Sequence, residues 1–436
     1  MNKNIIIIIV FVVVIVLGFF WFKDTSKTGI KSQPEKVVSD MEQRPQPSRA
    51  MKPSAGKQPD LSSILGQLTG QSEINELSEE ELLDILLDTS ASLKERRRAA
   101  FALAKSGGAD ILPKLEEMLS MEDTAPYLKA AILEGLGYSD QPQAKDLIVA
   151  MLQDENDVVV RGAIKGLSAT GNQEAVLILS NIMSSEGRPD SVIAEAALGL
   201  GKIDHPDAFK LLVDAYNEAA LSENTDRLDD VISALGYRDI TESGDFFKKI
   251  INEKTTDPSI RLAAIEAIQD AEGDTGSIFL SGLNDADSDV RAEAAWALAA
   301  ADDPGDISRE IETYLVQEQD AEVRKRLYQA LGNQENPDLN VVNDMVYNEP
   351  DLDARLAGYD VLAKNINSLE DENLLKQFNE TAVPELQEAA MSSKYLSFRL
   401  SAVMSLKKAK TKEANLALEQ IAEKSTDDKV AKAARM

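Results

Sequence analysis

A short helical segment recurs through most of this 436-residue chain. In its clearest copy, Asp257–Ile268, Asp257 can cap a helix, Pro258 suits the first helical position, and apolar residues follow at helical spacing. When ten copies are aligned on their last large apolar residue, eight of the nine spacings lie between 30 and 35 residues and the last is 44. A period of this size predicts stacked repeats. The aligned residues are Leu103, Leu136, Leu167, Leu200, Leu235, Ile268, Leu298, Leu331, Leu362 and Leu406.

Two positions of the repeat keep one type of side chain. One residue before the aligned position, nine of the ten copies have Gly, Ala or Ser, which predicts close approach between neighbouring helices. Seven residues before it, seven copies have a cation. We expect this cation to bond an acidic residue or a carbonyl of a neighbouring turn, such as Asp257, Asp289 or Asp320. The cations are Arg96, Lys129, Arg261, Arg291, Arg324, Arg355 and Arg399.

A second amphipathic helix lies between the copies, as in residues 144–154 and 206–216. Each repeat is therefore predicted to be a helix pair. The long spacing before Leu406 predicts either an insertion or a degenerate copy around residues 373–388.

Helices at both ends are expected to cap the array. Residues 61–94 are predicted to form an amino-terminal helical cap, in which Ser78 and Glu81 have the spacing of a capping box. Residues 427–436 begin a further copy that stops after half a repeat. The predicted fold class is therefore all-α, an α-solenoid of about ten helix pairs over residues 95–436.

The repeat resembles a known family. Asp257–Ile268 and Ser288–Leu298 follow the pattern D-x-x-V-R-x-x-A-A-x-A-L, which is similar to the HEAT-like repeats, especially the short phycobilisome-lyase type. The resemblance covers roughly residues 78–436 and implies an α-solenoid whose Val-Arg helices line the concave side. The sequence shows neither the Trp/Leu-Gly/Tyr pattern of tetratricopeptide repeats nor the Thr-Pro-Leu-His of ankyrin repeats.

The amino-terminal part of the chain has a different character. After a tail of residues 1–4, residues 5–22 are eighteen consecutive apolar residues or glycines, and they predict a single transmembrane helix about 27 Å long. A cleaved signal peptide is the alternative, but the bulky Phe-Phe-Trp-Phe ending argues against cleavage there. Residues 23–60 contain five prolines among polar residues and predict a disordered tether.

Two signals for the orientation of this anchor disagree. Lys23, Lys27 and Lys31 follow the span and favour a cytoplasmic repeat domain by the positive-inside rule. Amino-terminal apolar segments, however, usually direct export of the domain that follows them. We expect the repeat domain of this single-pass membrane protein to be extracytoplasmic, periplasmic or on the cell surface, with the cytoplasmic side as the alternative.

Composition excludes several kinds of chemistry and partner. With 46 Lys and Arg against 75 Asp and Glu, the formal net charge is −29. A nucleic-acid partner is therefore not expected, and a partner with basic character is favoured. Solubility of a long repeat protein is the alternative reason for this charge. The sequence has no cysteine, which excludes disulfides, thiolate catalysis and cysteine-ligated metals.

No motif of the sequence predicts catalysis, a cofactor or a metal site, so we expect no enzyme activity. His205, the single histidine, precedes a helix and is interpreted as a turn residue. Residues 284–290 resemble the start of a calcium loop, but Val290 stands where that loop needs glycine. Helix capping by Asp287 or Ser288 is the better explanation.

One position of the repeat varies freely, and on a regular scaffold such a position can encode recognition. It lies two residues before the aligned apolar residue, away from the small-residue face of the helix. Trp296 is the sharpest candidate, because aromatic side chains dominate binding hot spots; the alternative is that it fills a gap between repeats. The predicted partner-binding residues are Trp296, Phe101, Glu266 and Asp360.

These inferences predict a membrane-tethered scaffold that binds a protein or peptide in the concave groove of an acidic α-solenoid. Two alternatives stay open. One, implied by the family resemblance, is an accessory enzyme or chaperone of the lyase kind, and the other is a structural spacer arm in the cell envelope. A coherent patch around Trp296 would favour binding, and uniformly polar variable positions would favour the spacer.

Overall fold

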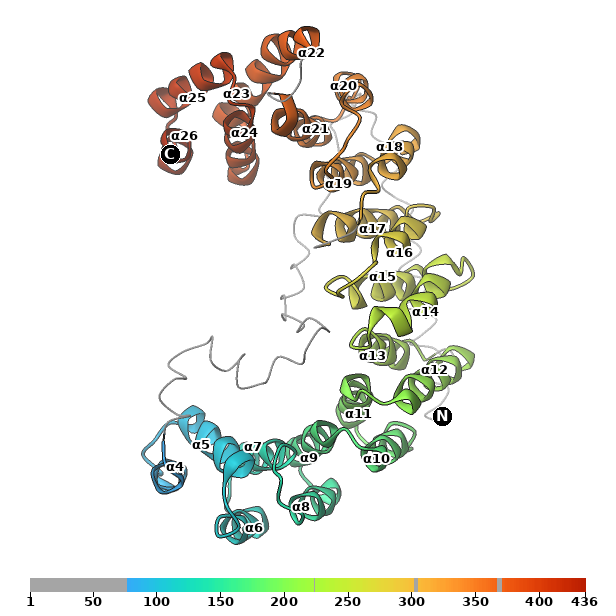
Figure 1. The fold of residues 1–436 in the computed structure, drawn as a ribbon, viewed down its shortest axis with the longest axis vertical. Coiled ribbons are helices and arrows are strands. Elements are labelled where there is room, and N and C mark those ends of the chain that lie inside the picture. The colour runs from blue at the N-terminus through green and yellow to red at the C-terminus, as the bar shows by residue number, and fades with distance from the viewer. Residues whose placement is uncertain (1–76, 223, 302–304, 367–370) are drawn as a thin grey trace, which may run out of the picture. The chain divides into compact units, whose positions relative to one another are not determined.

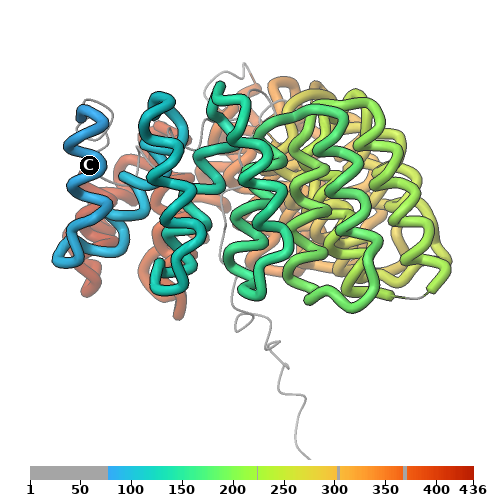
Figure 2. Tube along the Cα trace, turned by 90° about the horizontal axis from the view of Figure 1, so that it is seen from below, coloured from blue at the N-terminus to red at the C-terminus, as the bar shows by residue number. Residues whose placement is uncertain are grey.

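The computed structural model describes residues 77–222, 224–301, 305–366 and 371–436, all within the unit Lys52–Met436. These residues form helices and loops, with no strand among them. The helices alternate between an inner and an outer layer along a curve, and the inner layer faces the concave side (Figure 1). Figure 2 shows the helices of successive pairs lying side by side. The expected all-α solenoid is confirmed for this part of the chain.

The inner layer carries the aligned apolar residues of the repeat. Each of the ten lies in an inner helix or, for Ile268, directly after one, and all ten are buried. Each inner helix contacts the next, so the layer is continuous. The inner helices are α5 (Leu93–Ser106), α7 (Pro126–Leu136), α9 (Asp157–Thr170), α11 (Asp190–Lys202), α13 (Thr225–Leu235), α15 (Pro258–Ala267), α17 (Ser288–Ala300), α19 (Ala321–Gly332), α21 (Leu352–Asn365), α24 (Leu396–Ala409) and α26 (Asp428–Arg435).

The outer layer consists of the second helix of each pair, as expected from the amphipathic segments between the copies. Outside the α22–η4 segment, each outer helix packs on the inner helix that follows it in the chain. The outer elements are α4 (Glu79–Leu87), α6 (Leu112–Ser120), α8 (Ala144–Ala150) with the 3-10 turn η2 (Met151–Gln153), α10 (Gln173–Met183), α12 (Pro206–Leu221), α14 (Ile240–Asn252), α16 (Gly276–Gly282), α18 (Ser308–Gln317), α20 (Leu339–Tyr347), α22 (Glu372–Gln377), η4 (Phe378–Ala382), α23 (Val383–Ser392) and α25 (Lys412–Lys424).

The long last spacing of the repeat originates in this outer layer. Before α24 the outer segment is continuous from α22 through the π-helical turn η4 to α23. It is longer than the outer segment of any other described repeat. Of the two expected explanations, an insertion in the outer helix therefore accounts for the described residues, and a degenerate extra copy does not.

The helix starts follow the sequence closely. Asp257 caps α15, and Asp287 caps α17, where its carboxylate accepts the backbone N–H of Asp289 (2.9 Å). Ser78 and Glu81 form the expected capping box at the start of α4. These side chains satisfy N–H groups that the first turn of a helix leaves unpaired.

Close packing in the inner layer depends on the small-residue position. A Cβ added to Gly166 in α9 would lie 2.1 Å from the carbonyl oxygen of Leu133 in α7. A Cβ added to Gly135 in α7 would lie 2.5 Å from the carbonyl oxygen of Phe101 in α5. The prediction that small residues allow neighbouring helices to approach closely is confirmed at these interfaces.

Arginines join successive repeats in the carboxy-terminal part of the inner layer. Arg261 in α15 donates through Nε and Nη2 to the carboxylate of Asp285 (2.6 and 2.8 Å), which lies in the loop before α17. Arg291 in α17 donates in the same way to Glu318 (2.7 and 3.0 Å), which precedes α19. We call this series the arginine ladder. Its further pairs are Arg324–Glu349, Arg355–Glu385 and Arg399–Asp427.

Asp285, the first acid of the ladder, also orders the loop in which it lies. The Asp285 carboxylate accepts the backbone N–H of Asp287 (2.9 Å), and its carbonyl oxygen accepts Arg291 Nη1 (2.9 Å). One acid therefore receives the arginine of its own repeat and that of the preceding repeat. The Arg261 and Asp285 side chains are only 5% and 4% exposed, and paired hydrogen bonds of this kind fix orientation as well as distance.

The ladder corrects the predicted partners of these arginines. A bond to an acid or carbonyl of a neighbouring turn is confirmed, but the naming of Asp257, Asp289 and Asp320 was wrong. Asp257 and Asp320 cap α15 and α19 instead. The ladder acids Asp285 and Glu318 stand two residues before the caps of α17 and α19, where they can reach back to the preceding inner helix.

Cations in the amino-terminal half make a different contact. Arg96 Nε in α5 donates to the carbonyl oxygen of Leu86 (2.9 Å). Arg188, which precedes α11, donates through Nη1 to the carbonyl oxygen of Leu152 (3.0 Å). Neutral carbonyls thus take the place that carboxylates have in the ladder.

The predicted anchor, residues 5–22, and the predicted tether, residues 23–60, lie outside the described residues, as does the first part of the cap up to residue 76. Among the helices that the structure describes, none combines the length and apolar character that a membrane crossing needs. Anchor and tether stay predictions from the sequence.

Replacing Gly166 by Ala should destabilise the solenoid, although Ala is the better helix former. The added Cβ would meet the backbone of Leu133, so α7 and α9 would have to separate. Gly332→Ala is the matched control: its nearest neighbour would be Val361 Cγ2 at 3.7 Å, and Ala gains up to about 1 kcal/mol of helix propensity. Thermal unfolding should show a lower midpoint for the first variant only; equal shifts would contradict the close-approach argument.

Low pH should weaken the ladder. Burial alone would raise the pKa of Glu318, but hydrogen bonds from Arg291 and from the Asp320 N–H outweigh it and hold this pKa below its ordinary value. A carboxylate with a depressed pKa in the folded state adds stability that is present above the unfolded value of about 4 and is lost as the pH falls through the folded value. The protection of α17 and α19 amides, taken as their exchange rate relative to that of an unstructured peptide at the same pH, should therefore fall below about pH 4.

Glu318→Gln is the control for this pH effect. Its amide oxygen still accepts a hydrogen bond from Arg291, but the side chain does not titrate. This variant should be less stable than the wild type at pH 7 and should show a weaker pH dependence of amide protection in α17 and α19. An unchanged dependence would show that other groups cause the acid response.

Candidate functional site

The variable position of the repeat stays outside the core in every copy. Its ten side chains are half-buried or exposed, whereas the residue that follows is buried in nine of the ten copies. Residues four apart share one face of a helix. The open face of each inner helix is therefore built from the variable position and the positions four residues before and after it.

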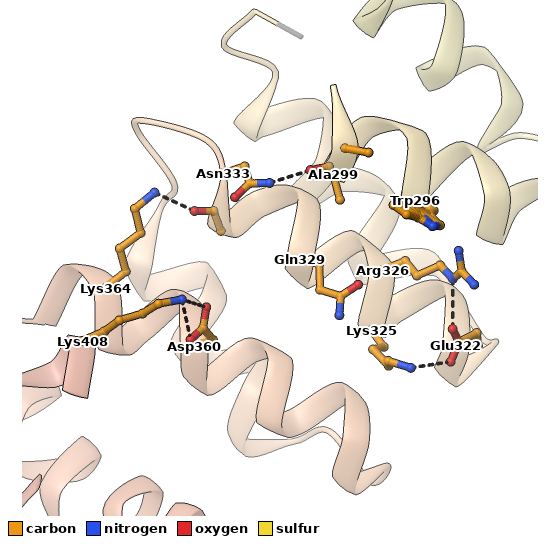
Figure 3. Close-up of a pocket in the computed structure, with 12 residues that line it drawn as sticks. Trp296, Ala299, Glu322, Lys325, Arg326, Gln329, Asn333, Asp360, Lys364 and Lys408 are labelled. Carbon is orange, nitrogen blue, oxygen red and sulfur yellow. Dashed lines mark hydrogen bonds and ion pairs between the residues drawn. The ribbon is translucent and has the colours of Figure 1, made fainter. Parts of the chain in front are cut away.

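On four consecutive inner helices this open face lines a hollow of about 640 Å³. Trp296 on α17, Gln329 on α19, Asp360 on α21 and Lys408 on α24 define it, and we call it the Trp296 hollow. Figure 3 shows these side chains projecting from successive helices toward a common space.

The structure brings two of the four predicted binding residues into this hollow, Trp296 and Asp360. Phe101 lies on α5 outside it and packs edge-on against Tyr138, with ring centroids 5.9 Å apart. Glu266 is exposed on α15 and is not part of the lining. The binding role of all four residues stays a prediction.

Charged side chains near Trp296 form hydrogen bonds and ion pairs with one another. Glu322 accepts hydrogen bonds from Lys325 Nζ (3.0 Å) and Arg326 Nε (2.9 Å; Figure 3). Arg326 Nη1 is buried, 3.9 Å from the carboxylate of Glu293, and has no hydrogen-bond partner in the described part of the chain. Burial raises the pKa of Glu293 above its ordinary value, although the Arg326 charge opposes the rise. Two cations and two carboxylates balance at this end of the hollow.

The other end of the hollow has more positive than negative charge. Lys408 Nζ on α24 donates to both carboxylate oxygens of Asp360 on α21 (2.9 and 2.6 Å; Figure 3), and Ser405 Oγ donates to the same carboxylate (2.7 Å). Lys364 Nζ donates to the carbonyl oxygen of Gly332 (2.7 Å), and no described carboxylate forms an ion pair with it. Among the described residues, this end of the hollow therefore has two ammonium groups and one carboxylate.

The cations of the hollow were missed by sequence reasoning. Lys364 lies four residues after Asp360, and Lys325 lies four residues before Gln329. This spacing places them on the same helix face as the variable position. The signal was therefore present, but only one of the three positions on the open face was considered.

The other residues considered for catalysis or metal binding are helix caps or members of the arginine ladder. His205 caps α12, where its Nδ1 accepts the backbone N–H of Asp207 (3.2 Å). In the segment that resembles a calcium loop, Asp285 is held by Arg261 and Asp287 caps α17. Across the described ranges, no group of three or more His, Asp or Glu side chains is placed to hold a metal ion.

Comparison with known families agrees with the repeat architecture. Residues 79–163, 120–190 and 276–363 match the family described as HEAT repeats. These matches support a HEAT-like repeat family for this chain, and the phycobilisome-lyase type stays a prediction. A search of curated proteins finds no match to the chain.

Solved structures with similar helical arrays include two of Kap121p. The complex of Kap121p with RanGTP is 13% identical, with a TM-score of 0.49 over 87% of this chain and 47% of that chain. The karyopherin Kap121p bound to the extreme C-terminus of the protein phosphatase Cdc14p is 14% identical, with a TM-score of 0.48 over 85% and 47%. An engineered protein is 20% identical, with a TM-score of 0.29 over 82% and 98%.

This chain spans about half the length of Kap121p. The identities of 13–20% and TM-scores of 0.29–0.49 give no ground for transferring a partner or an activity to it.

Trp296 should report the local charge of the hollow. The chain has two tryptophans, Trp21 and Trp296, so the emission of a Trp21→Phe chain comes from Trp296 alone. Among the described residues, the lining holds more cations than carboxylates. When each is divided by the quenching of free tryptophan, quenching by iodide should therefore be at least as strong as quenching by caesium, despite the net charge of −29. Stern–Volmer titrations at low ionic strength measure both quenchers. A clear preference for caesium would mean that the overall charge sets the potential at Trp296.

Proposed function

We propose that this protein is a membrane-tethered scaffold that binds a polypeptide partner on the concave face of its solenoid. The observation that carries the proposal is the Trp296 hollow, where an indole and polar side chains from four consecutive inner helices line one depression. Close packing and the arginine ladder hold these helices at a set spacing. A surface arranged before the partner arrives loses less entropy on binding, which favours affinity.

The composition of the hollow favours a binding surface over a spacer arm. A spacer needs only helix-to-helix contacts and soluble side chains on its open faces. In the hollow, the variable positions of α17, α19 and α21 instead provide an indole, a carboxamide and a carboxylate. Half-buried aromatic side chains bordered by polar groups are common at interaction hot spots. A lyase-type accessory role would gain support from a chromophore that co-purifies with the protein.

Membrane attachment enters the proposal through residues 5–22, whose apolar run predicts an anchor. Tethering would confine the partner to the membrane surface and raise its effective concentration there. We propose that the solenoid lies on the extracytoplasmic side. A reporter fused after Met436 tests this, because activity restricted to the cytoplasm would reverse the proposed orientation.

The charge expected of the partner depends on which surface of the solenoid it contacts. The net charge of −29 favours a basic partner for the surface as a whole. The lining of the Trp296 hollow has the opposite balance. The two expectations concern different surfaces, and they predict different ligands for Trp296.

Crosslinking and pull-down from intact cells should recover a defined partner with the wild-type protein and lose it with Trp296→Ala. Truncating a central aromatic side chain of an interface typically costs about 2 kcal/mol or more, so recovery should fall by roughly tenfold or more. Leu198→Ala is the matched control, since Leu198 has the same repeat position on α11 but does not line the hollow. Its recovery should equal that of the wild type.

Two other outcomes would change the proposal. A partner retained equally by both variants would place the binding surface elsewhere on the solenoid. Absence of any specific partner in repeated experiments would favour the spacer arm.

A further inference from the structure

The lining of the Trp296 hollow reverses the charge balance of the chain. Among the described residues it is lined by two carboxylates, Glu322 and Asp360, with a third, Glu293, beside Arg326, against four cations, whereas the chain as a whole has 75 acidic residues against 46 basic ones. Charges in water are screened over about 8 Å at physiological ionic strength, so this reversal acts on a ligand inside the hollow rather than at long range. The cations are Lys325, Arg326, Lys364 and Lys408.

The ammonium groups of the hollow retain hydrogen-bond donors. An ammonium group has three N–H donors. Lys364 uses one on the carbonyl oxygen of Gly332, and Lys325 uses one on the carboxylate of Glu322. Each can therefore donate to a further acceptor, and bonds from an ammonium to a carboxylate are the strong, charge-assisted kind.

The two carboxylates of the hollow, in contrast, are already engaged. Asp360 accepts from Lys408 at both oxygens and from Ser405. Glu322 accepts from Lys325 and from Arg326. A basic ligand would meet carboxylates whose charge these cations already offset. An acidic ligand meets the remaining donors without displacing anything, so the contacts favour an acidic ligand.

The hollow has an apolar wall at the end opposite Lys364 and Lys408. Trp296, Ala299 and Ala300 on α17 form this wall. Neighbouring helices are usually about 8–10 Å apart, so Trp296 on α17 and Lys364 on α21 are separated by roughly 16–20 Å. An extended polypeptide spans that distance with about five or six residues.

We infer that the Trp296 hollow takes an acidic polypeptide segment. An aromatic or aliphatic side chain of the segment packs on Trp296, and carboxylates about five or six residues away accept hydrogen bonds from Lys364 and Lys408. This inference rests on the proposed function, because it specifies the partner chemistry of the same site. An acidic solenoid repels acidic segments elsewhere on its surface, so the hollow gives specificity by charge as well as by shape.

The test titrates the full-length Trp21→Phe protein, in neutral detergent micelles, with synthetic peptides of about twelve residues while Trp296 emission is recorded. One peptide has a Leu followed by a run of Glu that begins about five residues later, and a second has the reverse order. A matched pair replaces every Glu by Lys. At least one acidic peptide should give a saturable change that weakens with added salt, and the Lys peptides should give none.

Variants of the protein locate the effect. Lys364→Gln combined with Lys408→Gln should weaken the acidic peptide by at least about fivefold, since each cation contributes roughly 0.5–1 kcal/mol to an exposed pair. Lys105→Gln combined with Lys202→Gln removes the same charge at the same repeat position on α5 and α11, outside the hollow, and should change affinity by less than about twofold. Equal losses in the two double variants would overturn the inference.

Asp360→Asn should change the affinity for the acidic peptide in the opposite direction. It removes the counter-ion of Lys408, while the amide oxygen can still accept the Ser405 hydroxyl. Binding of the acidic peptide should tighten, because the lining gains a net positive charge. Weaker binding would overturn the inference.

The inference and the proposed function fail in different ways. If crosslinking finds a partner that depends on Trp296 while the Lys peptides bind better, or no peptide binds, the scaffold function stands and the acidic segment is wrong. If the acidic peptide binds as expected but repeated crosslinking recovers no specific cellular partner, the chemistry of the hollow stands and the scaffold function is wrong.

Discussion

The contact between successive inner helices is the constraint on which the rest of the structure depends. A solenoid has contacts only between neighbouring repeats, so every interface must set both distance and orientation by itself. Gly166 sets the distance by letting α9 approach the backbone of α7. Arg291 and Glu318 set the orientation of α17 against the next loop, because two parallel hydrogen bonds hold one geometry. Buried ion pairs of this kind add less to net stability than to arrangement.

This spacing has a direct consequence for the candidate site. The Trp296 hollow is assembled from side chains of α17, α19, α21 and α24, none of which forms a site alone. Lys408 reaches Asp360 across the α21–α24 interface, and Lys364 reaches a carbonyl of α19. Lys364 and Lys325, which line the hollow, each use one ammonium donor in such contacts and keep others for a ligand, which connects the packing of the solenoid to the ligand that we propose.

Expectations based on local pattern agreed with the structure, and those based on distant contacts were less accurate. The capping role of Asp257 was predictable, because a cap bonds N–H groups two or three residues away. The partner of Arg261 was not, because Asp285 lies 24 residues further on, in a loop whose path depends on the next repeat. The four predicted binding residues share one helical position, yet the hollow includes Trp296 and Asp360 and excludes Phe101 and Glu266.

The sequence by itself determined the helices, their caps, the repeat period and the open face of each inner helix. All of these follow from spacings of a few residues or from a regular recurrence along the chain. Only the tertiary structure decided which open faces combine into a hollow and what charge that hollow has. The chain is acidic on average, but stacking brings Lys408 of α24 to Asp360 of α21, in the same hollow as Lys364. Such convergence depends on distances between helices, which a one-dimensional pattern does not contain.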